Sequence, residues 1–170
     1  MIRLRNVCTA FLRNGDDYLL MKRSDSRKIG PGLWYGVGGH MEPDEISSPQ
    51  EACLREILEE TGIPAEDVIG LRHRYIVMRR SGDEIVVNHF FFGQTRTRAV
   101  KDSEEGALFW VPEREVLERP FFSAIRLTLA HYLESGGLMA DILVGTVDQA
   151  EDALIRWTPL RDMSQEVNRS

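Results

Sequence analysis

The sequence contains only two cysteines, Cys8 and Cys53, and they do not form a CxxC pair. A scaffold held by disulfides needs several cysteines, and a cysteine-based zinc site needs them at short spacing. Neither is expected here. Cys8 lies in a stretch typical of a strand and Cys53 in one typical of a helix, so we interpret both as core thiols.

Long apolar runs are also missing, because no stretch approaches the roughly 20 residues that a membrane-spanning helix needs. Residues 1–17 lack the apolar core and small-residue cleavage site of a secretory signal. We therefore expect a cytoplasmic protein without a membrane partner. The chain has 170 residues, 42% hydrophobic and 28% charged, which suits one globular domain. We expect this domain to span residues 1–160, with a frayed polar tail at 161–170.

Positive charge is in deficit, since 21 Lys and Arg face 27 Asp and Glu for a net charge of −6. Such a balance disfavours binding to the phosphate backbone of a nucleic-acid polymer. A phosphorylated small molecule stays compatible with it if a divalent cation bridges the two negative partners. A metal site is therefore worth seeking.

The residue pattern predicts strands joined by tight turns, together with two helices. An NGDD turn predicts an N-terminal hairpin, and an SGD turn predicts a second one whose second arm is apolar enough to cross the sheet centre. The expected strands cover residues 2–12, 18–23, 33–37, 71–80, 84–94 and 107–112, with a further candidate at 139–147. One helix is expected at 49–61, ended by Gly62 and Pro64, and another within 121–137. Segment 140–157 could complete the sheet, cover the site or contact a partner.

The first of these helices carries Glu56, Glu59 and Glu60 in its C-terminal half. A helix C-terminus has a partial negative charge, so each carboxylate there costs about 0.3–1 kcal/mol. The i, i+3 and i, i+4 spacings also place the three like charges on one side, where they repel. One interpretation is a solvated acidic face. The other is a site for Mg²⁺ or Mn²⁺, which prefer oxygen ligands and would remove the repulsion.

The neighbouring residues favour the metal site. Gly39 is followed after five residues by Glu45, and the run closes as REILEETGI from Arg55 to Ile63. This pattern resembles the signature of the Nudix hydrolase family, which reads Gly, five residues, Glu, seven residues, Arg-Glu-aliphatic-any-Glu-Glu-any-Gly-aliphatic. Here nine residues separate Glu45 from Arg55, and we place the two extra ones in the loop at 46–48.

The resemblance implies an α/β Nudix fold, with a mixed β-sheet sandwiched between helices. It implies metal-dependent hydrolysis of a nucleoside diphosphate linked to another moiety. The implied ligands of Mg²⁺ or Mn²⁺ are the carboxylates of Glu56, Glu59 and Glu60 with the backbone carbonyl of Gly38. Arg55 would orient these carboxylates, and Glu45 is a further catalytic position of the family.

The general base is left open between two regions. Glu56 or Glu60 could deprotonate a metal-bound water. In parts of the family the base comes from a downstream loop, where Glu104 and Glu105 are the candidates, although a solvated loop explains these two residues equally well.

Substrate choice is signalled more weakly. The stretch GPGLWYGVGG resembles a segment of MutT-like nucleoside triphosphate pyrophosphatases, which implies cleavage of a nucleoside triphosphate, oxidised or not, to monophosphate and pyrophosphate. Trp34 and Tyr35 alternate on a short strand, so one could stack on a base, although core packing is the simpler role for each. Arg23 could meet phosphates or be a solvated strand end. A homodimer through exposed strands is left open.

Three alternatives accompany this interpretation. A nucleotide sugar or ADP-ribose could be the substrate. A non-catalytic nucleotide sensor of the same family would be expected to lose motif glutamates, which are present here. An isopentenyl-diphosphate isomerase would need a cysteine facing its substrate, and we expect Cys8 and Cys53 in the core instead.

Overall fold

The computed structural model describes residues 1–24, 30–137, 140–147 and 154–161. Its strands are β1 (Arg3–Asn14), β2 (Asp17–Arg23), β3 (Trp34–Tyr35), β4 (Val68–Ser81), β5 (Glu84–Thr95), β6 (Gly106–Pro112), β7 (Ile142–Val147) and β8 (Thr158–Leu160). Its helices are α1 (Pro49–Thr61), α2 (Glu113–Val116) and α3 (Ser123–Glu134), with short 3₁₀ turns η1 (Pro43–Glu45) and η2 (Ala65–Asp67). The expected tail lies, except for Arg161, outside the described residues.

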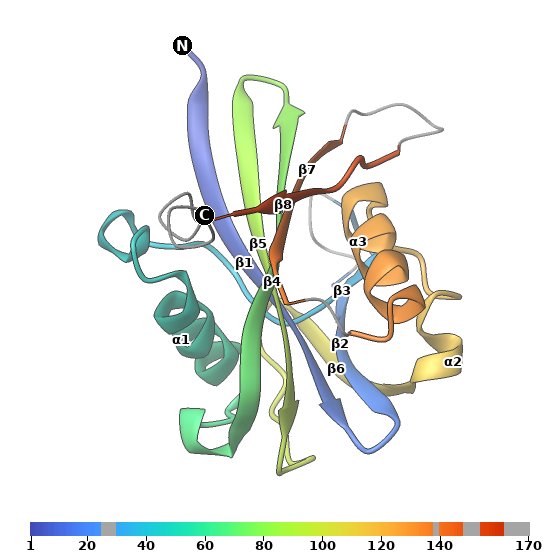
Figure 1. The fold of residues 1–170 in the computed structure, drawn as a ribbon. Helices are drawn as coiled ribbons and strands as arrows, with labels where there is room; N and C mark the ends of the chain where they lie inside the picture. The colour runs from blue at the N-terminus through green and yellow to red at the C-terminus, as the bar shows by residue number, and fades with distance from the viewer. Residues whose placement is uncertain (25–29, 138–139, 148–153, 162–170) are drawn as a thin grey trace, which may run out of the picture.

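The described strands form one mixed sheet in the order β3-β2-β1-β5-β4-β7-β8, with β6 also beside β2. β1 runs parallel to β5, and β4 runs parallel to β7, whereas the other pairs are antiparallel. Figure 1 shows β5 between β1 and β4 in the middle of the sheet. The prediction that this arm crosses the sheet centre is confirmed.

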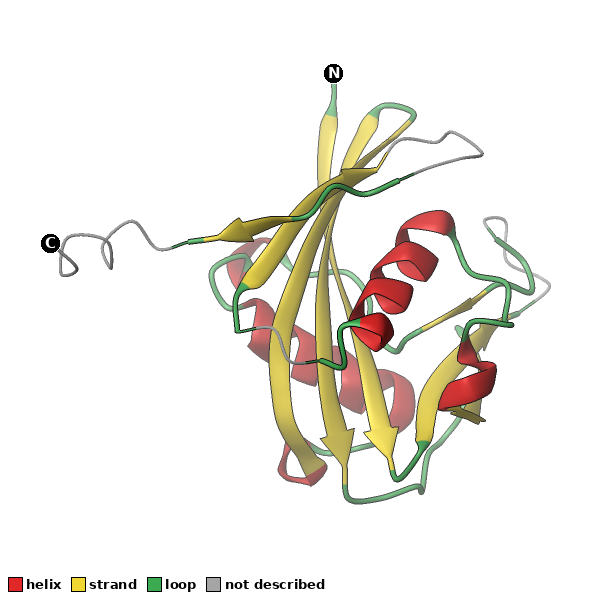
Figure 2. Cartoon of the chain, turned by 45° about the vertical axis from the view of Figure 1, so that its right-hand side comes forward, coloured by secondary structure: helices red, strands yellow, loops and turns green. Residues whose placement is uncertain are grey.

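Helices cover both faces of the sheet, α1 on one side and α3 on the other (Figure 2). Successive side chains of a strand point to opposite faces. Phe11 of β1 therefore lies in the same core cluster as Leu129 of α3, and its neighbour Leu12 lies in the other cluster, with Ile57 of α1. This arrangement confirms the expected mixed sheet between helices.

The strand expected at 33–37 is shorter than predicted. Of this stretch, only Trp34 and Tyr35, which form β3, pair with β2, and Val37 then bridges to Ala10 of β1. The chain can cross to β1 because glycine allows a close approach. A Cβ on Gly38, whose φ is 142°, would lie 2.3 Å from the carbonyl oxygen of Cys8. This crossing lays the start of the motif along β1.

The C-terminal part adds strands to the edge of the sheet. The candidate strand at 139–147 is confirmed over Ile142–Val147 as β7, and its first residue lies outside the described residues; β8 and the short helix α2 were not expected from the sequence. Both cysteines are buried and unpaired by disulfides, as predicted for core thiols. Among the described residues, no helix is long and apolar enough to cross a bilayer.

A histidine pair lies on the α1 face of the sheet. Nδ1 of His89 is 3.3 Å from Nε2 of His73, whose ring also stacks on Phe91 at a centroid distance of 4.6 Å. Burial lowers the pKa of His73 to about 4, and the neighbouring His89 adds to this effect. Between pH 6.5 and 4, His73 is therefore protonated in the unfolded chain but remains neutral in the folded chain. The contribution of His73 to stability is complete above pH 6.5 and is lost as the pH falls toward 4.

We expect His73→Phe to flatten this acid dependence. Between pH 7 and 4 the free energy of unfolding of the variant should fall by about 2 kcal/mol less than that of the wild type. Urea denaturation at each pH measures the difference. Parallel pH profiles would contradict the assignment of this titration to His73.

Candidate functional site

Helix α1, which carries the acidic motif, has well-defined ends. Pro49 stands in its first turn, where a missing N–H costs nothing, and Gly62 ends the helix in the left-handed conformation at φ 75°. Glu56 and Glu60 are buried, with 9% and 5% of their surface exposed, whereas Glu59 is exposed. The motif is therefore only partly a solvated acidic face, because two of its three carboxylates lie inside the protein.

Arg55 ties the carboxylates together. Its Nη1 donates to Oε1 of Glu56 at 2.8 Å and to Oε2 of Glu59 at 3.2 Å. Its Nε and Nη2 donate to the two carboxylate oxygens of Glu45 at 2.7 and 2.8 Å, and Nη2 also donates to the carbonyl of His40 at 3.1 Å. A planar guanidinium suits such two-point recognition. Arg55 thus fixes the orientation of three carboxylates at once.

The two extra loop residues do not prevent Glu45 from reaching Arg55. Glu45 ends η1, where its Oε2 also accepts the backbone N–H of Glu42 at 2.8 Å. The Arg55 guanidinium is the main reason that the pKa of Glu45 is lowered to about 2. Glu45 is therefore a charged anchor for Arg55.

Glu60 is held against the loop that follows β3. Its Oε2 accepts the backbone N–H of Gly38 at 2.6 Å. Burial raises the pKa of Glu60 to about 8, and the charges of Glu56 and Glu105 add to that rise, while the Gly38 N–H opposes it. Burial also raises the pKa of Glu56, although Arg55 favours its charged form. These carboxylates thus lack sufficient positive charge around them.

Gly39 packs directly against one of these carboxylates. A Cβ at this position would lie 2.3 Å from Oε2 of Glu56, so only glycine lets the backbone come so near. Gly38 and Gly39 also line a cavity of about 200 Å³ between the sheet and the start of α3. The carboxylates therefore lie just behind the wall of this cavity.

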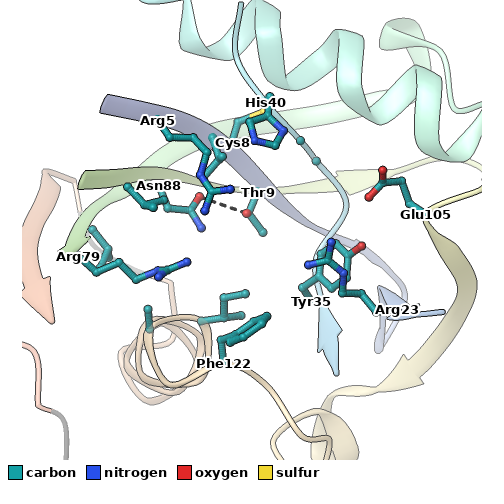
Figure 3. Close-up of a pocket in the computed structure, with 17 residues that line it drawn as sticks. Arg5, Cys8, Thr9, Arg23, Tyr35, His40, Arg79, Asn88, Glu105 and Phe122 are labelled. Atoms are coloured by element: carbon teal, nitrogen blue, oxygen red, sulfur yellow. Dashed lines mark hydrogen bonds between the residues drawn. The ribbon is translucent and has the colours of Figure 1, made fainter. Parts of the chain in front are cut away.

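Figure 3 shows the polar side chains that point into the cavity. Besides Gly38 and the buried Cys8, the residues singled out from the sequence that line it are Arg23, Tyr35 and Glu105, and the guanidinium of Arg23 lies over the Tyr35 ring at 5.5 Å. Trp34 is not among the lining residues. It packs instead against Phe109, with a centroid distance of 5.2 Å. Tyr35 is therefore the better placed of the two aromatic candidates.

The two candidate base residues in the loop before β6 are separated by the structure. Glu105 lines the cavity, whereas Glu104 is exposed and borders a different surface pocket beside Phe109. Of these two candidates for the general base, position therefore favours Glu105 over Glu104.

Other cavity residues were missed by the sequence reasoning. They share the α3 face of the central strands and are Arg5, Thr9, Arg79 and Asn88. The available signal was polar residues inside otherwise apolar strands, as in EIVVNHFFF. That signal points to a shared site only when the strand order is known. β1 and β4 are far apart in the sequence, and the sheet places them on either side of β5.

Among the described residues, no group of three or more His, Cys, Asp or Glu side chains is gathered closely enough to hold a metal ion by itself. Arg55 occupies the space between Glu56 and Glu59, and Glu60 turns to the Gly38 N–H. The role of the three glutamates as metal ligands accordingly stays a prediction.

Comparisons with known proteins agree with the fold. The NUDIX domain model matches residues 3–132. The MutT protein of Bacillus halodurans superposes with a TM-score of 0.70 and 25% identity, over 92% of this chain and 99% of that chain. The MutT protein of Methanosarcina mazei Go1 superposes with a TM-score of 0.66 and 26% identity, over 79% of this chain and 96% of that one.

A curated relative matches a shorter part. The nucleoside triphosphatase NudI of Enterobacter sp. (strain 638) is 41% identical over 61 residues, which cover 36% of this chain and 42% of that protein. The chain thus spans less than half the length of this relative. The family model nevertheless covers most of the chain, and the Arg55-centred carboxylate cluster follows the family's signature. The chain belongs to the Nudix hydrolase family.

Proposed function

We propose that this chain hydrolyses a pyrophosphate bond in a nucleoside diphosphate linked to another moiety, with a divalent cation as cofactor. The observation that carries the proposal is the Arg55 network. It fixes Glu45, Glu56 and Glu59 beside a cavity whose wall, at Gly38, holds Glu60.

The donor set fits Mg²⁺ or Mn²⁺. Carboxylate oxygens are the ligands that these hard cations prefer, and the raised pKa values of Glu56 and Glu60 mark a place where added positive charge would be stabilising. Gly39 leaves the room beside Glu56 that a side chain would fill. The residues proposed to hold the cation are Glu56, Glu59, Glu60 and the carbonyl of Gly38. When bound, it supplies polarisation of the phosphoryl oxygens and a more acidic water.

The other residues of the site have separate roles in this proposal. Arg55 positions the carboxylates and does not touch the substrate. Glu105 accepts the proton of the attacking water, because it lines the cavity near Glu60, whose pKa its charge raises, and needs no place among the proposed ligands. Arg23 and Tyr35 lie at the same side of the cavity, where a cation and an aromatic face can hold the nucleotide.

For the substrate, we propose a nucleoside triphosphate that is cleaved to monophosphate and pyrophosphate. The names of the relatives, a nucleoside triphosphatase and MutT proteins, support this choice. A nucleotide sugar or ADP-ribose is the second candidate. The retained carboxylates favour hydrolysis over a purely sensing role.

A substrate panel tests the proposal. Nucleoside triphosphates, oxidised purine triphosphates, ADP-ribose, nucleotide sugars and dinucleoside polyphosphates are incubated with Mg²⁺ or Mn²⁺, and the products are separated by ion-exchange chromatography. Monophosphate and pyrophosphate from a triphosphate is the expected result. Binding of a nucleotide without turnover of any panel member would favour the sensor instead.

Arg55 gives a prediction about positioning. Arg55→Gln should lower kcat/KM by about 10- to 100-fold, the usual cost of losing a group that orients metal ligands. Arg55→Lys keeps the charge but loses the planar guanidinium, so its kcat/KM should lie between those of Arg55→Gln and the wild type. Steady-state kinetics measures both. Unchanged kinetics in Arg55→Gln would show that the carboxylates need no such support.

A further inference from the structure

Two arginines line the cavity at the side away from Arg23 and Glu105 (Figure 3). The strand register places Arg5 of β1 opposite Val86 of β5, and Val86 opposite Arg79 of β4. The two arginines therefore flank Val86 in one row across three strands, about 10 Å apart at the backbone. Both side chains point into the cavity, so their guanidinium groups can reach one group held between them.

The arginine pair, Arg5 and Arg79, is poorly neutralised. Arg5 has one ion pair among the described residues, to Glu84 at 3.4 Å. No hydrogen bond or ion pair joins the Arg79 side chain to any residue that the structure describes. Burial lowers the pKa of Arg79, and the nearby charge of Arg5 lowers it further, while the charge of Glu84 acts in the opposite direction with a smaller effect. Two half-buried cations side by side are costly, and an anion between them would offset that cost.

The distance between the arginine pair and the carboxylates sets the length of the part of a bound substrate that lies between them. A Cβ on Gly38 would be 3.0 Å from the Cα of Thr9, so the motif loop crosses β1 at Thr9. Arg5 is four residues further along the same strand, which corresponds to about 13 Å. That length suits a sugar or nucleoside lying between a pyrophosphate at the carboxylates and a second anionic group at the arginines.

The intervening floor suits such a group. Val7, Asn88 and Val77 form the next row of the sheet, and the Thr9 hydroxyl donates to Oδ1 of Asn88 at 3.1 Å. The surface is thus apolar with a small polar centre, and it carries no further charge. Charge recognition within this part of the cavity rests with the arginine pair.

We propose that the arginine pair binds a phosphate or carboxylate at the end of the substrate remote from the pyrophosphate bridge. The inference rests on the proposed pyrophosphohydrolase function and concerns its second candidate class, nucleotides joined to a sugar-containing group, which it narrows to those that carry a second acidic group. A neutral sugar leaves both guanidinium groups unsatisfied. The proposed selectivity depends on the second acidic group of the substrate. It can therefore be tested with pairs of compounds that differ in the presence of that group.

Two matched pairs supply the probes, UDP-glucose with UDP-glucuronate and NAD⁺ with NADP⁺. Their dissociation constants are measured by calorimetry in EDTA, so turnover plays no part. In at least one pair we expect the acidic member to bind about 10- to 100-fold more tightly to the wild type, as for a hydrogen bond to a charged group. Arg79→Gln should abolish that preference, and Arg79→Lys should retain part of it. Arg80→Gln, on the exposed neighbouring position, is the control.

Equal binding within both pairs, no binding at all, or a preference that survives in Arg79→Gln would overturn the proposal. A preference for GTP over ATP that Arg79→Gln removes, without any acidic preference, would assign the arginines to a base edge and also overturn it. Loss of hydrolysis in the substrate panel with the acidic preference intact would refute the proposed function alone.

Discussion

Glu60→Gln is expected to abolish most of the activity while leaving the fold intact. Glutamine has nearly the same shape as the carboxylic acid and can still accept the Gly38 N–H. It cannot supply negative charge for a divalent cation, whose contribution to charge stabilisation is several kcal/mol. A loss of about 4 kcal/mol corresponds to a fall in kcat/KM of roughly 10³-fold. Kinetics with Mg²⁺ measures the fall, and thermal denaturation checks the fold.

The matched control for this variant is Glu51→Gln. Glu51 belongs to the same helix, but it is exposed and lies in the first turn, away from the carboxylate cluster. It should keep wild-type activity. If Glu60→Gln retained activity within a few fold of the wild type, Glu60 would have no part in holding the cation.

The second large effect is expected at Glu105. If Glu105 accepts the proton of the attacking water, Glu105→Gln should lower kcat by about 10²- to 10⁴-fold, the range for loss of a general base. KM should change little, because the carboxylates and the arginines of the cavity are untouched. Steady-state kinetics at saturating Mg²⁺ gives both constants.

Glu104 provides an internal comparison for this prediction. It is the adjacent acid in the same loop, but it borders a different pocket and is exposed. Glu104→Gln should therefore behave as the wild type. Equal losses in the two variants would indicate that the loop needs negative charge in general, and a loss only in Glu104→Gln would transfer the role to that residue.

The motif on α1 could be predicted from sequence because its information is local. The Arg-Glu and Glu-Glu pairs, the Gly62 stop and the preceding glycines are fixed by spacing within one strand, loop and helix. The contact between Glu45 and Arg55 could not be predicted with certainty, since two inserted residues alter the path of the loop. The short turn η1 brings Glu45 back to the guanidinium.

The cavity was harder to predict because its residues come from distant parts of the chain. Arg5, Asn88 and Arg79 share a surface only because parallel pairing places β1 next to β5 and antiparallel pairing places β5 next to β4. Each is unremarkable by itself within its strand. Which of Trp34 and Tyr35 faces the cavity likewise depends on the direction in which β3 leaves β2. Alternation in the sequence shows that the two side chains face opposite ways, but not which way each one faces.

The central claim is that the carboxylates of α1 bind a divalent cation, and direct Mn²⁺ binding tests it most closely. Electron paramagnetic resonance counts free Mn²⁺ during titration of the wild type, Glu56→Gln, Glu60→Gln and Glu51→Gln, without substrate. The account predicts saturable binding that is retained in Glu51→Gln and weakened at least about tenfold in the other two variants. Mn²⁺ affinity that is the same in all four proteins would contradict it.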